Sequence, residues 1–309
     1  MNMSKWEIKP ISQPLDVGTR IHWDKCNQRA IFVDVPKGTV HSCKLNSCGV
    51  TTAKVGDEPI AFMFPVEGSR TKFVAGLGKK FVFVEWDGVS PEVASVETIV
   101  EVETDPEYEG NRLNGGKVDP WGRLWAGTMG PPGPDGNIIP HRGALYCLVK
   151  GNLKKHVCNI GISNGLAWNV ETKKMYYIDT LEPYVFQYDI ADDARITNKT
   201  VVFDFKKNNI EGLPDGLTID VEGNLWVCAI HGYHLVKFDP KCGHVLDKIE
   251  FPTPQITAVS FGGPKLDLML VTTARIPIDG TPPPDPAGTT YLVSSSNTVP
   301  GYAGDNYIP

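Results

Sequence analysis

Residues 118–125 read Val-Asp-Pro-Trp-Gly-Arg-Leu-Trp, and residues 219–226 read Ile-Asp-Val-Glu-Gly-Asn-Leu-Trp. Both segments pair an apolar residue with an Asp, turn through a Gly and continue into an apolar, aromatic run. Weaker versions of this turn-and-strand motif are centred on residues 24, 67, 169 and 262. The six turn residues follow one another at intervals of 42 to 52 residues. A period of this length is typical of the blades of a β-propeller.

The repeat predicts an all-β fold, a six-bladed β-propeller whose blades are four-stranded antiparallel sheets. Short runs rich in β-branched and aromatic residues, bounded by Gly, Asp or Pro, recur along the chain. No stretch keeps a helical period over three turns. Because six repeats fill the sequence, we expect one domain over residues 1–309.

Residues at equivalent places in the repeats should lie on one ring, because the blades are related by rotation about the propeller axis. Five positions before each turn residue, five of the six residues are polar, and several are oxygen donors suited to hard cations. We therefore expect a metal or substrate site at one end of the axis. These six ring residues are Thr19, Phe62, Asn114, Asn164, Asp215 and Thr257.

Composition and charge argue against several classes of protein. Hydrophobic residues make up 41% of the chain and charged residues 21%, as in ordinary globular proteins. A net charge of −6 without a basic patch argues against nucleic-acid binding, and no apolar run approaches the roughly 18 residues of a membrane span. The first ten residues lack the apolar core of a signal peptide, so we expect a cytoplasmic protein. We further expect a monomer whose partner is a small-molecule substrate or ligand.

Several motifs, in order and at matching spacing, resemble the senescence marker protein/regucalcin/gluconolactonase family, and most of all its insect luciferin-regenerating enzyme branch. The resemblance spans about residues 15–305 and implies a six-bladed propeller with one divalent cation at an end of its channel. Many members hydrolyse lactones, and others act on related esters or organophosphates. The matching segments are residues 111–120, 127–129, 163–168, 176–179, 214–216, 223–227 and 261–264.

The resemblance also implies roles for individual residues. Asn164 and Asp215 match two metal ligands, and Asp215 also matches the carboxylate that activates water. Asn114 and Arg112 match an Asn and an Arg that contact the substrate. The third family ligand is a Glu of the first blade, and this chain has Thr19 in its place.

The loss of the Glu leaves Asp215 as the only carboxylate among the ring residues. A hard dication such as Ca, Zn or Mg requires several oxygen ligands and partial neutralisation of its charge. The hydroxyl group of Thr19 attracts a cation far less strongly than a carboxylate does. We therefore expect a single divalent cation as cofactor, weakly bound or absent.

Three functions remain open. The first is a hydrolase that acts on a lactone or related ester with help from the weakened cation site. The second is a divergent member, either a non-lactonase enzyme or a binding protein similar to luciferin-regenerating enzyme. Small residues such as Gly115 and Gly130, which replace acidic ones, would then widen its pocket. The third, a structural propeller, is disfavoured because polar ring residues converge on the axis, and the Asn164–Asp215 pair favours the hydrolase.

Overall fold

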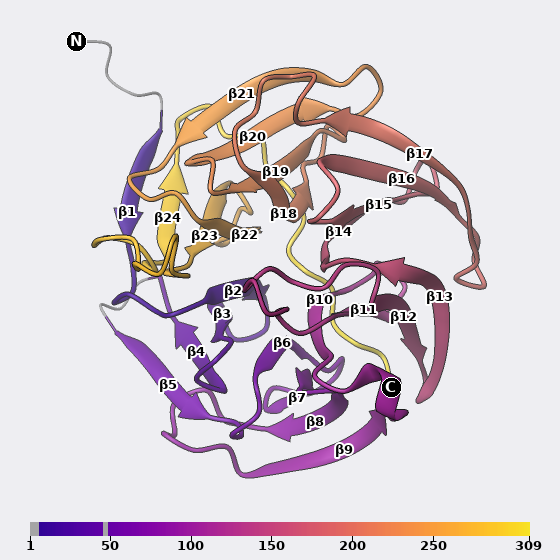
Figure 1. Ribbon diagram of the computed structural model, residues 1–309. Helices are drawn as coiled ribbons and strands as arrows, with labels where there is room; N and C mark the ends of the chain where they lie inside the picture. Colours follow the sequence, from indigo (N-terminus) through magenta and orange to yellow (C-terminus); the bar gives the residue numbers. More distant parts are fainter. Residues whose placement is uncertain (1–5, 46–48) are drawn as a thin grey trace.

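Six sheets surround a central axis in the computed structural model, which describes residues 6–45 and 49–309 (Figure 1). Each sheet has four antiparallel strands, and the described residues contain one short 3-10 helix, η1 (Pro106–Tyr108). No helix of this described part is long and apolar enough to cross a membrane. The predicted six-bladed β-propeller of four-stranded blades is confirmed.

The four strands of a blade follow one another from the axis to the rim. The innermost strands are β2 (Gly18–Asp24), β6 (Ile60–Pro65), β10 (Arg112–Val118), β14 (Ser163–Asn169), β18 (Leu213–Ile219) and β22 (Ile256–Gly262). The outer strands of blade 1 are β3 (Arg29–Asp34), β4 (Thr39–Cys43) and β5 (Val50–Lys54), and those of blade 2 are β7 (Lys72–Leu77), β8 (Lys80–Glu85) and β9 (Ser95–Glu101). The outer strands of blade 3 are β11 (Leu124–Met129), β12 (Gly143–Val149) and β13 (Asn152–Ile160), and those of blade 4 are β15 (Lys174–Asp179), β16 (Tyr184–Ile190) and β17 (Ile196–Asp204). The outer strands of blade 5 are β19 (Leu225–Ile230), β20 (His234–Asp239) and β21 (His244–Glu250).

Blade 6 joins the two ends of the chain. It contains β22, β23 (Leu268–Thr273) and β24 (Tyr291–Ser294), and its outermost strand is the N-terminal β1 (Glu7–Pro10). Strands β1 and β24 pair antiparallel, with Glu7 opposite Ser294. The first strand of the sequence therefore completes the last blade.

The segment after β24 crosses the centre of the propeller (Figure 1). Tyr307 forms a parallel bridge with Val66 of blade 2, and Gly301 forms an antiparallel bridge with Asp220 of blade 5. The Ile308 N–H donates to the Gly122 carbonyl oxygen at 2.9 Å. This C-terminal segment thus ties three blades together at the ends of the inner strands that lie opposite the ring residues.

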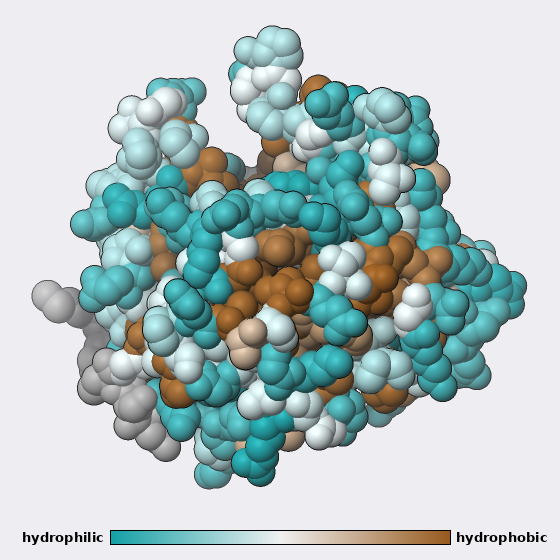
Figure 2. Space-filling view, turned by 90° about the horizontal axis from the view of Figure 1, so that it is seen from below, coloured by the Kyte–Doolittle hydropathy of each residue, from teal (hydrophilic) through white to brown (hydrophobic). Residues whose placement is uncertain are grey.

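The core lies between the blades. Strands near the axis are buried almost throughout, whereas in an outer strand such as β21 exposed side chains alternate with half-buried ones and one side chain is buried. This pattern follows from geometry, because an inner strand has neighbours on both faces and an outer strand meets solvent. On the rim near β5 and β9, hydrophilic side chains cover most of the surface and hydrophobic ones gather in the middle of the face (Figure 2).

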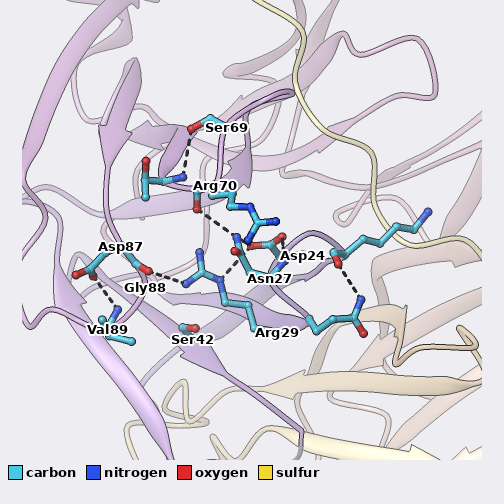
Figure 3. A network of polar contacts seen from close by, with 12 residues as sticks. Asp24, Asn27, Arg29, Ser42, Ser69, Arg70, Asp87, Gly88 and Val89 are labelled. Atoms are coloured by element: carbon cyan, nitrogen blue, oxygen red, sulfur yellow. Dashed lines mark hydrogen bonds and ion pairs between the residues drawn. The ribbon is translucent and has the colours of Figure 1, made fainter.

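A polar network joins blades 1 and 2 beside the first turn of the repeat (Figure 3). Asp24 accepts a hydrogen bond from Arg29 Nε at 3.0 Å, and both side chains are almost fully buried. Arg29 Nη1 donates to the Asp87 carbonyl oxygen of blade 2 at 3.1 Å. Asp24, the turn residue of the repeat, thus orients the Arg29 guanidinium, which hydrogen-bonds the neighbouring blade.

Candidate functional site

The ring residues lie near the N-terminal ends of the innermost strands. In blades 3, 4 and 5 the pairing register of the innermost strand shifts across the ring residue, which is the signature of a β-bulge. A bulge leaves a residue unpaired and re-aims its side chain, so these irregularities free Asn114, Asn164 and Asp215 from the regular alternation. The shifts fall between Leu113 and Gly116, Ser163 and Leu166, and Pro214 and Leu217.

Arg20, which follows Thr19 in β2, is the site residue that sequence reasoning missed. It is buried, with 8% of its surface exposed, and its φ angle of 52° is left-handed. Its Nη2 donates to Asn164 Oδ1, and its Nε donates to the Asn114 carbonyl oxygen at 3.4 Å. A signal was present in the sequence, because Asn114, Asn164 and Asp215 are each followed by Gly, whereas Thr19 is followed by Arg.

Asn164 connects Arg20 to Asp215. Besides accepting from Arg20, its side chain hydrogen-bonds Asp215, and its Nδ2 donates to Thr180 Oγ1 at 2.8 Å. Burial raises the pKa of Asp215 to about 7, although the positive charge of Arg20 and the Asn164 hydrogen bond both act to lower it. The Asp215 carboxyl can therefore take up or release a proton near neutral pH.

Arg112 and Asn114 lie next to this group and are half-buried. Arg112 Nη1 donates to Asn114 Oδ1 and to the Leu113 carbonyl oxygen, both at 2.9 Å. Asn114 Nδ2 donates to the Ser163 carbonyl oxygen at 2.9 Å, which links blades 3 and 4. Burial, with a smaller contribution from the charge of Arg20, lowers the pKa of Arg112 to about 10. The structure therefore brings the two expected substrate residues next to the two expected metal ligands.

The other ring positions serve packing. Phe62 is fully buried and its ring stacks on Phe64, with 5.4 Å between centroids. Thr257 Oγ1 donates to the Gly18 carbonyl oxygen at 2.6 Å, which joins blade 6 to blade 1. Thr19 is buried beside Arg20, with 6% of its surface exposed.

The second hypothesis expected Gly115 and Gly130 to widen the pocket, but neighbouring atoms fill the space at both glycines. A Cβ atom on Gly115 would lie 2.6 Å from the Asn164 carbonyl oxygen, so this glycine allows two inner strands to approach closely. The cavity lined by Arg20, Asn164 and Lys117 has a volume of about 30 Å³. That volume holds a water molecule or two, so an organic substrate has to bind outside this cavity, on the side of the half-buried Arg112 and Asn114.

Lys117 lies further along the axis, toward the C-terminal segment. Burial lowers its pKa to about 8, and its Nζ donates to the Leu217 carbonyl oxygen at 3.1 Å. Burial raises the pKa of Asp305 to about 6, opposed by the charge of Lys117. A larger cavity of about 570 Å³ lies at this end, lined by Lys117, Trp168 and Tyr302 among others. It contains none of the expected site residues, so the candidate site is the axial site formed by Arg20, Arg112, Asn114, Asn164 and Asp215.

The axial site does not fit the divalent cation that the sequence led us to expect. Arg20 already bonds to Asn164 Oδ1 and to the Asn114 carbonyl oxygen, and its positive charge would repel a dication. Asp215 is the only carboxylate among the ring residues, so the site offers one negative charge to an ion that carries two positive ones. Within residues 6–45 and 49–309, no group of three or more His, Cys, Asp or Glu side chains could hold a metal.

Fold and site together define a six-bladed propeller with a polar axial site built from the innermost strands. Residues 17–275 match the family model described as "SMP-30/Gluconolactonase/LRE-like region". The chain is 34% identical to regucalcin of Homo sapiens over 261 residues, which is 83% of each protein. It is 33% identical to regucalcin of Sus scrofa over the same length. The chain belongs to the SMP-30/gluconolactonase/LRE-like family.

Solved structures agree with this assignment. A luciferin-regenerating enzyme matches with a TM-score of 0.91 and 38% identity, over 98% of this chain and all of that enzyme. A regucalcin from Agrobacterium tumefaciens, described as a calcium-binding protein, matches with a TM-score of 0.84 over 98% of both chains. At 22% identity the latter likeness shows the fold alone. The resemblance inferred from the motifs is confirmed.

Proposed function

We propose that this protein hydrolyses a lactone or a related carboxylic ester in the axial site, with Asp215 as the general base. The observation that carries the proposal is the cluster around Asp215, a buried carboxyl beside Asn164 and Arg20 in the same group as the half-buried Arg112 and Asn114. Burial raises the pKa of this carboxyl to about 7. A carboxylate with a pKa near the working pH combines adequate basicity with a useful ionised fraction.

The reaction follows from these positions. Ionised Asp215 takes a proton from a water molecule, and the water oxygen attacks the ester carbonyl carbon. N–H groups of Arg112 stabilise the negative charge that develops on the carbonyl oxygen. The bond from the carbonyl carbon to the ring oxygen then breaks, and the proton on Asp215 passes to the leaving alkoxide. The product of a lactone is the open hydroxy acid.

The charges along the axis favour an anionic substrate. The axial site sets the positive charges of Arg20 and Arg112 against the Asp215 carboxyl, whose pKa is raised by burial. The balance near neutral pH is therefore positive. Nε and Nη2 of Arg112 make no hydrogen bond to residues 6–45 or 49–309, so they are available to an acceptor. A lactone that carries a carboxylate fits this environment.

A paired substrate panel tests the proposal. The EDTA-treated protein is assayed by pH-stat with γ-lactones that carry a carboxylate and with the methyl esters of the same carboxylates. We expect turnover with higher kcat/KM for the charged member of a pair, and a loss of roughly 10²–10⁴-fold in Asp215→Asn, as for removal of a general base. An absence of turnover across lactones and simple esters would contradict the proposal.

A second candidate function is small-molecule binding without turnover, as in a divergent member of the family. The observation that favours it is burial, because Asn164 and Asp215 are each only 5% exposed. In that case a lactone from the same panel binds with equal affinity to the wild type and to Asp215→Asn, and is recovered unchanged.

A further inference from the structure

Blade 1 departs from blades 3, 4 and 5 at the residue that follows the ring position. In those three blades it is Gly115, Gly165 or Gly216, where a Cβ atom would lie 2.5 or 2.6 Å from a backbone oxygen of the next blade. In blade 1 it is Arg20, whose φ of 52° is left-handed, a conformation that residues with a side chain adopt infrequently. Such a conformation persists only where the surroundings hold it in place.

Interactions of the Arg20 side chain hold the backbone in this conformation. The guanidinium reaches across the axis and bonds Asn164 Oδ1 of blade 4 and the Asn114 carbonyl oxygen of blade 3. Burial disfavours its charge, and the negative charge of Asp215 compensates most strongly among its neighbours. Because a guanidinium keeps its proton in proteins, the axial site contains a permanent positive charge between an amide oxygen and a carboxyl.

We propose that Arg20 is the resident cation of the axial site and takes the place that a divalent metal ion would otherwise occupy. The guanidinium occupies the oxygen acceptors, contributes one positive charge and meets a single ring carboxylate, Asp215. Because Thr19 has no carboxylate, the site lacks the second negative charge that would favour a dication over the guanidinium. The inference concerns binding and does not depend on hydrolysis.

Metal titration of matched variants tests this inference. Wild type, Thr19→Glu, Arg20→Gly and the Thr19→Glu/Arg20→Gly double variant are titrated calorimetrically with Ca²⁺, Mg²⁺ and Zn²⁺ after chelation. We expect no binding by wild type or Thr19→Glu, because Arg20 still occupies the acceptors. We expect the double variant to bind at least one of these ions 100-fold more tightly than Thr19→Glu alone.

Two controls keep the result interpretable. Arg20→Gly places at position 20 the residue that follows the ring position in blades 3 to 5, and glycine accepts a left-handed φ. Circular dichroism melts establish that each variant is folded. Thr19→Glu/Arg20→Lys retains a positive charge and should bind no metal.

Three outcomes would overturn the inference. They are a micromolar divalent-metal site in the wild type that disappears in Asp215→Asn, equal metal affinity of Thr19→Glu and the double variant, and a folded double variant that binds no metal. Metal binding is measured without substrate, so a failure of the hydrolase proposal would leave these results unaffected.

Discussion

At the scale of single residues, Asp215 couples the chemistry of the site to the stability of the fold. Its pKa is about 7 in the folded protein, against about 3.9 for an aspartate in an unfolded chain. The folded state therefore binds the proton more tightly. The contribution of this group to stability is fully present below about pH 4 and is lost as pH rises through about 7.

This linkage predicts how Asp215→Asn changes the pH dependence of stability. The melting temperature of the wild type should fall more steeply between pH 5 and pH 8 than that of the variant, which has no carboxyl to ionise there. Asp305, with a pKa of about 6, contributes in the same direction to both proteins and cancels in the comparison. Parallel curves from thermal melts across this range would contradict the raised pKa of Asp215.

The same group predicts the pH dependence of activity. A general base acts in its ionised form, so kcat/KM should rise with pH and reach half of its plateau near pH 7. Arg112, with a pKa of about 10, stays charged throughout that range. Initial rates from pH 5.5 to 8.5 measure the profile. A flat profile would exclude Asp215 as the base.

At the scale of elements, the turn between β10 and β11 is held by one buried carboxylate. Asp119 Oδ1 accepts from the N–H groups of Trp121 and Arg123, at 3.0 and 2.9 Å. Its Oδ2 accepts from Arg123 Nε at 2.6 Å and from Trp125 Nε1 at 2.8 Å. Because Asp119 is fully buried and Arg123 nearly so, the carboxylate stabilises both the turn and the charge of Arg123.

Asp119→Ala should therefore lower the free energy of unfolding by about 3–5 kcal/mol, the cost of leaving a buried charge without its partner. Asn169→Ala, at the matching turn of blade 4, is the control. The Asn169 side chain accepts from the Thr172 N–H at 3.0 Å in an exposed turn, and its loss should cost about 1 kcal/mol. Urea denaturation measures both. Equal losses would mean that the Asp119 network adds nothing beyond the turn itself.

At the scale of the whole molecule, the C-terminal segment and β1 determine how the propeller closes. Tyr307 is 1% exposed, packs beside Phe83 and donates its backbone N–H to the Pro65 carbonyl oxygen at 2.9 Å. Strand β1 adds the outer edge of blade 6. Strand β1 and the C-terminal segment are therefore both parts of the closed ring of blades.

Tyr307→Ala should lower the free energy of unfolding by about 3–5 kcal/mol, as for other large aromatic side chains removed from a core. Tyr302 lies in the same segment but is 54% exposed, so Tyr302→Ala should change stability by no more than about 0.5 kcal/mol. Guanidinium denaturation of the two variants gives the comparison. Similar midpoints for both would show that the segment does not hold the blades together.

Much of the molecule could be read from the sequence, because blade number and strand order depend on local patterns. Turn residues such as Asp119 and Asp220 recur at blade spacing, and each begins the turn that leads to a strand. The motifs around Asn114, Asn164 and Asp215 also indicated the family, and the structure brings these three residues together. Strand alternation and turn chemistry are short-range properties, so they survive in a single sequence.

The conformation of Arg20 depends on packing and could not be read in this way. Position 20 is next to Thr19 in the chain, but its side chain bonds Asn164, 144 residues away, through a left-handed backbone and a bulged strand. The burial of Phe62 between blades was likewise decided by its neighbours. The sequence by itself determined six blades, their order and the polar ring. Only the tertiary structure decided that an arginine occupies the axis, because closing the propeller sets which distant groups meet there.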